Sequence, residues 1–337
     1  MPVTLKDLSK YLNLSPATIS RALNKKGRVS KETRKRVIHA ATKFHYRPND
    51  TARTLKTKRS SAIGVIIPDA TNIFYSIMLK SIDQELLKKG FSTIFCDSDE
   101  SIERETEYYY ILKSKQVSKM IIVTAGDNDI YRTERSLANI VFVDNMPRID
   151  RKFSSVSINN EKAAYDLTQL VINHGHQDIA VICGNLSETT SYDRLEGFKR
   201  CVMDNNLAHN LVNVYLGSFR YQSGYNSTKA ILQKENRPTA IFAQNNMQAY
   251  GAIQALREAS LSIPDDISVV CFDAIDETGM MSPKLTCVMQ PVEEIGRQAV
   301  LGFMRNLESE HEEGVEYSAT VLDYTLCMGD SLKNIEH

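Results

Sequence analysis

The sequence predicts a small all-α head followed by a much larger α/β body. The 337 residues carry 41 basic and 41 acidic side chains, yet residues 1–59 hold 16 basic and 3 acidic ones, a difference of +13. The rest of the chain therefore carries −13, and such asymmetry indicates a nucleic-acid contact at the basic end. Short helix-period stretches fill the head, whereas apolar runs alternate with longer amphipathic stretches in the body.

The head contains three predicted helices, each preceded by a small polar residue. Thr4 precedes the first helix and Asp7 follows three places later, which is a capping-box pattern. Ser15 caps the second helix, and Pro16 occupies the first helical position, where its missing N–H is tolerated. Ser30 caps the third helix. Two short helices joined by a tight turn are typical of a helix-turn-helix, whose second helix enters the major groove of DNA.

The second helix carries the side chains expected to meet DNA. Pro16 and Ala17 lie at its start, Thr18 and Ser20 are suited to phosphate contact, and Arg21 follows Ala17 by one turn on the same face. Arginine can donate to two acceptors of one guanine. A small helical bundle with a solvated basic face is the alternative, and spacing alone leaves both open. The charge of the head favours DNA binding.

The segment 47–60 connects the head to the body without being rich in glycine or serine. Pro48 ends the third helix, and Asn49 can cap a short helix that reaches Lys56. Leu55 is an apolar residue among basic ones, which suits a wedge inserted into a minor groove. Packing of Leu55 against the body is an equally acceptable interpretation.

The body alternates predicted strands with predicted helices. Strands are expected at residues 63–67, 91–96, 120–123, 140–143, 179–183, 212–216, 240–243 and 269–272. Helices are expected at residues 73–88, 103–113, 161–173, 192–205, 224–234, 247–258 and 292–307. This alternation predicts parallel sheets with right-handed crossovers. The strands form two groups divided near Asn159, so we expect two lobes with a ligand-binding cleft between them.

Polar side chains at strand ends suit the hydroxyl groups of a polyol. Asp69, Asp144, Asn245 and Asp273 each follow an apolar strand directly, and their oxygens and amides can form paired hydrogen bonds with hydroxyls. Arg194 lies one turn into a helix, where its forked guanidinium can bind two hydroxyls or a carboxylate. Rings suited to stacking on a sugar are Phe74, Tyr75 and Phe219. Helix capping, ion pairing and core packing explain any one of these residues as well.

Other classes of protein are disfavoured. The sequence lacks a GxGxxG after a strand, a P-loop, an HExxH and a GxSxG, so we expect no enzyme; a sugar-processing hydrolase built on two strand-end carboxylates is the alternative. His174 and His176 have no cysteine or carboxylate at metal spacing, so no metal or cofactor is expected. The absence of a membrane-length apolar run and of a signal-peptide pattern, with six scattered cysteines, predicts a cytoplasmic protein with reduced thiols.

Four segments of the head and linker resemble the headpiece and hinge of the lactose/galactose repressor (LacI/GalR) family: residues 4–8, 15–24, 46–49 and 52–55. The resemblance implies a homodimer on a palindromic operator, with paired hinge helices in the minor groove and Leu55 as the intercalating side chain. Predicted contacts to double-stranded operator DNA are Thr4, Ser15, Pro16, Ala17, Thr18, Ser20, Arg21, Asn24, Arg28, Asn49, Ala52, Arg53, Leu55 and Lys56.

The body resembles the same family in residues 63–75, 193–198, 240–247, 251–256, 263–273 and 283–291. This implies the two-lobed type I periplasmic-binding-protein fold, whose chain crosses between lobes near Asn159, Gln290 and Ala319. The resemblance implies contacts to a sugar-like effector from Phe74, Asp144, Arg194, Phe219, Asn245, Asp273 and Gln290, to which Asp69 and Tyr75 are added from their positions at the strand end and the helix start.

The resulting domain prediction has three parts. Residues 1–46 form the headpiece, 47–60 the hinge and 61–337 the effector-binding and dimerisation domain. Within that domain, one lobe comprises about 61–158 and 291–318, and the other about 159–289 and 319–330.

Three features depart from the family pattern. Asn246 stands where the family usually has an acidic residue, and Ala274 stands where a second aspartate often follows. The short tail after Gly329 has no leucine heptad, so we expect a dimer and not a tetramer. We therefore expect a repressor of a sugar-utilisation operon, released from or recruited to its operator by a small molecule. A solute-binding protein of the same body fold is the alternative, but it would have no use for the head.

Overall fold

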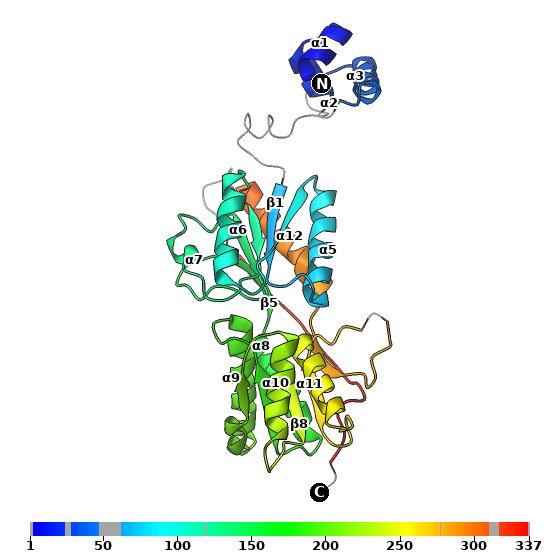
Figure 1. Ribbon diagram of the computed structural model, residues 1–337. Helices are drawn as coiled ribbons and strands as arrows, with labels where there is room; N and C mark the ends of the chain where they lie inside the picture. Colours follow the sequence, from blue (N-terminus) through cyan, green and yellow to red (C-terminus); the bar gives the residue numbers. More distant parts are fainter. Residues whose placement is uncertain are drawn as a thin grey trace. The chain divides into compact units, whose positions relative to one another are not determined.

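The computed structural model describes residues 3–23, 28–46, 62–117, 119–276, 278–309 and 317–335. The chain divides into two compact units, Met1–Ser61 and Ala62–His337, and each is described by itself (Figure 1). Within the described residues, the helices are too short or too polar to cross a membrane.

The first unit contains the three predicted helices, α1 (Leu5–Leu12), α2 (Pro16–Leu23) and α3 (Lys31–Lys43). The predicted capping box is present, because the hydroxyl of Thr4 accepts from the backbone N–H of Asp7 while the Asp7 carboxylate accepts from the backbone N–H of Thr4. The apolar side chains of all three helices share one small core, which consists of Leu8, Leu12, Ile19, Ala22, Val37, Ala40 and Ala41.

The second unit contains two six-stranded sheets. The first sheet has the strand order β11-β5-β4-β3-β1-β2, and all its neighbouring strands are parallel. Its strands are β1 (Ala62–Ile67), β2 (Ser92–Asp97), β3 (Met120–Ile122), β4 (Ile140–Val143), β5 (Ser154–Ile158) and β11 (Ala319–Leu322). Helices α5 (Ile73–Lys88) and α12 (Val292–Ser309) cover one face, and α6 (Ile102–Ser114) and α7 (Ile130–Thr133) cover the other.

The second sheet has the order β12-β10-β9-β8-β6-β7, and β12 alone runs antiparallel to its neighbour. Its strands are β6 (Ile179–Cys183), β7 (Val214–Leu216), β8 (Ala240–Ala243), β9 (Ser268–Phe272), β10 (Thr286–Met289) and β12 (Thr325–Cys327). Helices α8 (Asn160–Asn173) and α9 (Thr189–Asp204) pack on one face, and α10 (Tyr221–Leu232) and α11 (Asn246–Glu258) on the other. A 3-10 helix, η1 (Ala208–Val212), precedes β7.

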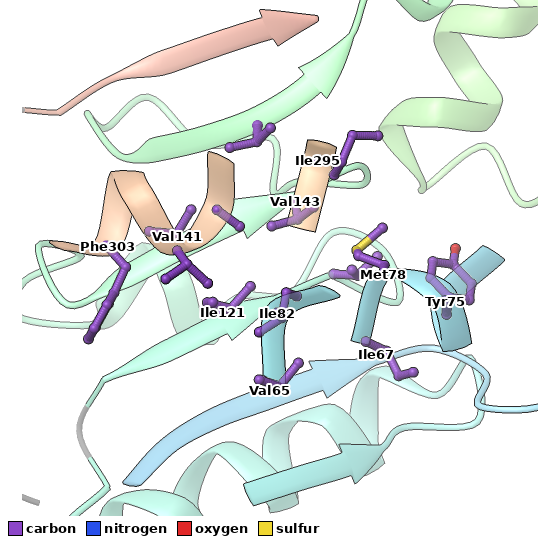
Figure 2. Close-up of a cluster of buried hydrophobic side chains, with 14 of the residues drawn as sticks. Val65, Ile67, Tyr75, Met78, Ile82, Ile121, Val141, Val143, Ile295 and Phe303 are labelled. Carbon is purple, nitrogen blue, oxygen red and sulfur yellow. The ribbon is translucent and has the colours of Figure 1, made fainter. Parts of the chain in front are cut away.

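Alternation along β1 shows how one strand supplies two cores. Ile63, Val65 and Ile67 pack under α5 and α12, whereas Ile66 points to the opposite face and packs under α6. Figure 2 shows the first of these clusters, in which Met78 and Phe303 approach the sheet from the two covering helices. Strands buried on both faces read as continuous apolar runs, which is why the sequence located β1 correctly.

The chain passes three times between the sheets, and this places the ligand cleft at the crossings. Two crossings agree with expectation, since β5 ends just before Asn159 and β10 ends just before Gln290. The resemblance implied a third crossing near Ala319, but the structure places it a few residues later. Ala319 begins β11, which pairs with β5 in the first sheet, so the crossing falls between Leu322 and Thr325 and residues 319–322 belong to the first lobe.

Four strands escaped the sequence prediction, namely β5, β10, β11 and β12. In β5 the residues Ser154, Ser155 and Ser157 are as buried as their apolar neighbours, so composition concealed a core strand. β11 and β12 are sheet-edge strands with mixed exposure, and neither gives a long apolar run. The strand expected to begin at Val212 begins at Val214, because Val212 ends the 3-10 helix.

Candidate functional site

The predicted DNA-facing side of the head is exposed. Pro16, Ala17 and Arg21 are exposed on α2, while Ile19 and Ala22 on the opposite face are completely buried. The Ser15 hydroxyl accepts from the backbone N–H of Thr18 at 3.1 Å, so it caps the helix as predicted. Of the other predicted contacts, Thr4 and Arg28 are exposed, and Thr18 and Ser20 are half-buried.

The remaining predicted DNA contacts lie outside the described residues. These are Asn24 in the head and the linker residues Asn49, Ala52, Arg53, Leu55 and Lys56. Their roles stay predictions from the sequence and the family resemblance.

A second candidate site lies in the cleft between the two lobes of the body. Eight of the nine predicted effector contacts line one small cavity there, together with Asn72, Thr190 and Asn246. The eight are Phe74, Tyr75, Asp144, Arg194, Phe219, Asn245, Asp273 and Gln290. Each of the eleven side chains is at most 9% exposed. The cavity measures about 20 Å³, which is enough for one water but not for a sugar, so a ligand enters only when the lobes separate.

Strand ends position the two buried aspartates of the cleft. Asp144 follows β4 and Asp273 follows β9, and both have a positive φ, of 58° and 56°. This left-handed conformation turns the chain sharply away from the sheet, and aspartate tolerates it better than most residues. Gln290, which follows β10, donates its backbone N–H and its side-chain amide to Asp273 at 3.0 and 2.7 Å.

Arg194 lines the cavity and is only 3% exposed. Its Nε donates to Oδ1 of Asn160 at 2.8 Å, and its Nη1 donates to the carbonyl of Gln244 at 2.6 Å. The guanidinium also lies over the Phe272 ring, with 3.9 Å between its carbon and the ring centroid. Among the described residues, Arg194 forms no ion pair with its neighbours Glu188 and Asp193.

Side chains from the two lobes meet directly across the cleft. Asn72, at the start of α5, and Asn246, at the start of α11, exchange two amide hydrogen bonds of 3.2 and 3.0 Å. Oδ1 of Asn145 accepts from the backbone N–H and the hydroxyl of Thr189, both at 2.7 Å. Such contacts form only when the lobes are closed, so they stabilise the closed arrangement.

A charged pair also links the lobes. Arg220 donates to Asp99 at 2.7 Å and to Glu100 at 3.0 Å, and its side chain is about half exposed. Exposed ion pairs contribute little to stability, roughly 0–1 kcal/mol each. The Arg220 contacts are therefore a weak addition to the buried amide pair.

Burial raises the pKa of several carboxyl groups around the cleft. Desolvation lifts the pKa of Asp144 to about 6, although the Arg194 charge opposes this shift. Burial also raises the pKa of Asp273, while Arg194 and the hydrogen bonds from Gln290 oppose the shift. The pKa of Glu188 lies well above its usual value because burial and the nearby charges of Glu100 and Asp144 act in the same direction.

Asp69 is the one predicted effector contact that does not line the cavity. Its carboxylate instead accepts from the backbone N–H and the hydroxyl of Thr71, at 2.8 and 2.6 Å. A short carboxylate commonly binds its own loop two residues on, and this local turn holds Asp69 outside the closed cavity. Its contact with an effector stays a prediction from the sequence.

Three lining residues were not predicted as contacts. Asn72 caps α5, Thr190 lies in the first turn of α9, and Asn246 begins α11. Asn246 had attracted notice only as a departure from the family pattern. Their positions in the sequence could have predicted these contacts, because each residue stands at a helix start that follows a strand of a parallel sheet. In the described residues, no group of three or more His, Cys, Asp or Glu side chains is arranged to hold a metal ion.

Comparison with known proteins agrees with this architecture. Residues 4–49 match the family described as bacterial regulatory proteins of the lacI family, and residues 60–324 match the family of periplasmic binding proteins and the sugar binding domain of the LacI family. The HTH-type transcriptional repressor PurR of Histophilus somni (strain 2336) is 29% identical over 98% of this chain and 99% of its own. The ribose operon repressor of Halalkalibacterium halodurans is 32% identical over 93% of each chain.

A solved structure gives the same result. The lac repressor dimer bound to operator and the anti-inducer ONPF superposes with a TM-score of 0.84 at 26% identity, over 99% of this chain and 100% of that one. Fold and site together define a regulator that combines a helix-turn-helix with a two-lobed ligand-binding body. The chain belongs to the LacI family of bacterial transcriptional regulators.

Proposed function

We propose that this protein is an operator-binding transcriptional repressor whose DNA affinity is set by a small polar effector in the cleft. The observation that carries the proposal is the closed cavity, in which buried polar groups from both sheets converge around Arg194. Burying so many polar groups is unfavourable unless they are satisfied. A ligand that satisfies them binds the closed lobes more tightly than the open ones and so shifts the equilibrium between them.

Coupling between the cleft and DNA follows from the crossings of the chain. The two lobes are joined by three segments, so a change in their angle moves the whole first lobe, from whose β1 the chain leads back to the head. The effector changes operator affinity only by its differential affinity for the two arrangements. An inducer lowers operator affinity and a corepressor raises it, and the same movement of the lobes can serve either.

The family supports a homodimer on a palindromic site. The lac repressor to which the chain is similar is described as a dimer bound to operator. Two recognition helices α2 in such a dimer would meet successive major grooves about one helical turn apart. We expect the effector to be a sugar or a sugar derivative, since one matched relative is named the ribose operon repressor and the matched family is described by its sugar binding domain.

The DNA-binding part of the proposal is tested with duplexes that the protein selects from a randomised palindromic pool. Affinity for the selected duplex should fall steeply with salt, since phosphate contacts release counterions. Arg21→Ala should weaken binding to the selected duplex by about 1–3 kcal/mol while changing non-specific binding much less. Arg200→Ala is the matched control, because Arg200 is a half-exposed arginine of the body paired with Glu161.

Three outcomes would overturn the repressor assignment. It fails if the pool yields no preferred sequence, or if affinity for the selected duplex is insensitive to salt. It also fails if Arg21→Ala and Arg200→Ala affect binding equally. A solute-binding protein or an enzyme with this body would give those results.

A further inference from the structure

Glu188 is a buried carboxylate without a hydrogen-bond partner. It precedes α9 and is 5% exposed, yet its side chain does not cap the helix. In the part of the chain that the structure describes, no backbone or side-chain group donates to its carboxylate, and no cation forms an ion pair with it. Burial of an unpaired carboxylate is strongly unfavourable, so a residue of this kind needs an explanation beyond folding.

The surroundings of Glu188 make it less stable still. Its charge is repelled by Glu100 and by Asp144. The same three carboxylates also raise the pKa of the Tyr75 hydroxyl, to which burial contributes most. Glu188 does not line the closed cavity, but Thr190, two residues further along the chain, does. One end of the cleft is therefore rich in negative charge.

The nearby cations are already engaged elsewhere. Arg194 attracts Glu188 at a distance, but its Nε and Nη1 are bound to Asn160 and to the carbonyl of Gln244. Arg220 is paired with Asp99 and Glu100. Neither arginine neutralises the Glu188 carboxylate directly.

The cavity also has unused acceptors. Asp144 is 5% exposed, and its Oδ1 has no hydrogen-bond partner among the described residues; the same is true of Oε1 of Gln290. Both residues line the cavity. The cavity therefore offers two free acceptors to a ligand that donates hydrogen bonds.

Glu105, a buried glutamate in the other lobe, is a useful comparison because its carboxylate is fully hydrogen-bonded. It is completely buried and accepts from the side-chain amide of Asn128 at 2.9 Å and from the hydroxyl of Tyr131 at 2.7 Å. The backbone N–H of Ala125 donates to it as well. The fold thus satisfies a buried glutamate where it needs one, and it leaves Glu188 unsatisfied.

We infer that Glu188 is a specificity-determining residue of the cleft and that it binds a positively charged nitrogen of the effector, a protonated amine or amidine on a hydroxyl-bearing ligand. This rests on the proposed function, because it identifies the ligand class of the same cleft. A cation would neutralise the excess of carboxylates around Glu188, Asp144 and Glu100. A neutral polyol would leave that excess in place, and a phosphorylated sugar would add to it.

The first experiment needs no ligand and compares two isosteric variants of the full chain. Glu188→Gln should raise the melting temperature of the unliganded protein, since it removes a repelled charge without changing volume. Glu105→Gln should lower the melting temperature, since an amide cannot accept all three hydrogen bonds. If Glu188→Gln lowers stability as Glu105→Gln does, Glu188 has a structural role and the inference fails.

The second experiment uses ligands matched except for charge. The probes are glucose, glucosamine, N-acetylglucosamine and glucose 6-phosphate, with the galactose series in parallel, measured by thermal shift and calorimetry. The amino sugar of a series should bind about 10- to 100-fold more tightly than its neutral and acetylated counterparts, as expected for a charge-assisted hydrogen bond. Glu188→Gln should abolish this preference, and Glu188→Asp should restore part of it.

The results separate this inference from the repressor assignment. Preference for a neutral or phosphorylated probe, or no advantage for an amino sugar in either series, overturns the role of Glu188 while salt-dependent binding to the selected duplex stands. Failure to bind any duplex overturns the repressor assignment, whereas the charge preference of the cleft can still be measured.

Discussion

Replacing Asp144 by asparagine should change how the stability of the body depends on pH. Asp144 is the cleft residue whose pKa is raised to about 6, with burial as the largest cause. Asparagine has the same shape and also tolerates the positive φ of 58° at this position, so the substitution removes the charge without straining the backbone. The variant therefore removes the titration of Asp144, together with the charge by which Asp144 raises the pKa of Glu188.

The magnitude follows from the difference between the folded and unfolded pKa. A carboxyl that titrates at about 6 when folded and at 3.8 when unfolded binds more protons in the folded state between these values. The contribution of Asp144 to the free energy of unfolding is fully present below the pKa of the unfolded state. It is lost as the pH rises through the pKa of the folded state. The total is about 3 kcal/mol, of which about half is lost between pH 5 and pH 7.5.

The assay is urea unfolding at several pH values, followed by circular dichroism because the chain contains no tryptophan. The free energy of unfolding of Asp144→Asn relative to the wild type should grow by about 1–2 kcal/mol between pH 5 and pH 7.5. Asp276→Asn is the control, since the pKa of half-buried Asp276 is lowered to about 2, chiefly by the hydroxyl of Thr278. The stability that Asp276 contributes is lost only as the pH falls below the usual range of aspartate pKa values. The stability difference between Asp276→Asn and the wild type should therefore be constant between pH 5 and pH 7.5. If the Asp144→Asn difference is equally constant, the reasoning about burial is wrong.

Three further predictions concern packing, the head and lobe closure. Gly224→Ala should lower the urea midpoint because a Cβ there overlaps the backbone of α11, whereas Gly302→Ala, whose Cβ has no neighbour closer than 3.8 Å, should raise stability by up to ~1 kcal/mol; equal effects would contradict this. Leu8→Ala should destabilise the head by ~2–5 kcal/mol and abolish specific DNA binding while the melting of the body, followed calorimetrically, is unchanged. Asn246→Ala, which removes the buried amide pair with Asn72, should open the lobes more often, seen as a larger radius of gyration in X-ray scattering, and Arg200→Ala, which breaks a pair within one lobe, should not.

Sequence reasoning succeeded wherever a local pattern and the tertiary environment agreed. Helix α5 was predicted with its observed bounds, Ile73–Lys88, because its apolar side chains recur at helical spacing after the capping residue Asn72. Strand β5 was missed because its serines are buried for reasons that lie in the neighbouring strands. At the site, Asp144 and Asp273 were predicted because carboxyl ends of parallel strands meet at one edge of a sheet. Asp69 obeys the same rule but is bound by its own loop instead.

The sequence by itself determined the division into a basic head and an acidic body, the helix-turn-helix, the two α/β lobes and most of the cleft residues. These follow from charge, periodicity and residue order, which are local properties of the chain. Only the tertiary structure decided that Asn72 pairs with Asn246, that Ala319 belongs to the first sheet, and that buried Glu188 has no hydrogen-bond donor among the described residues. Such facts depend on which distant segments exclude water from a side chain and which donors they bring with them, and no local pattern carries that information.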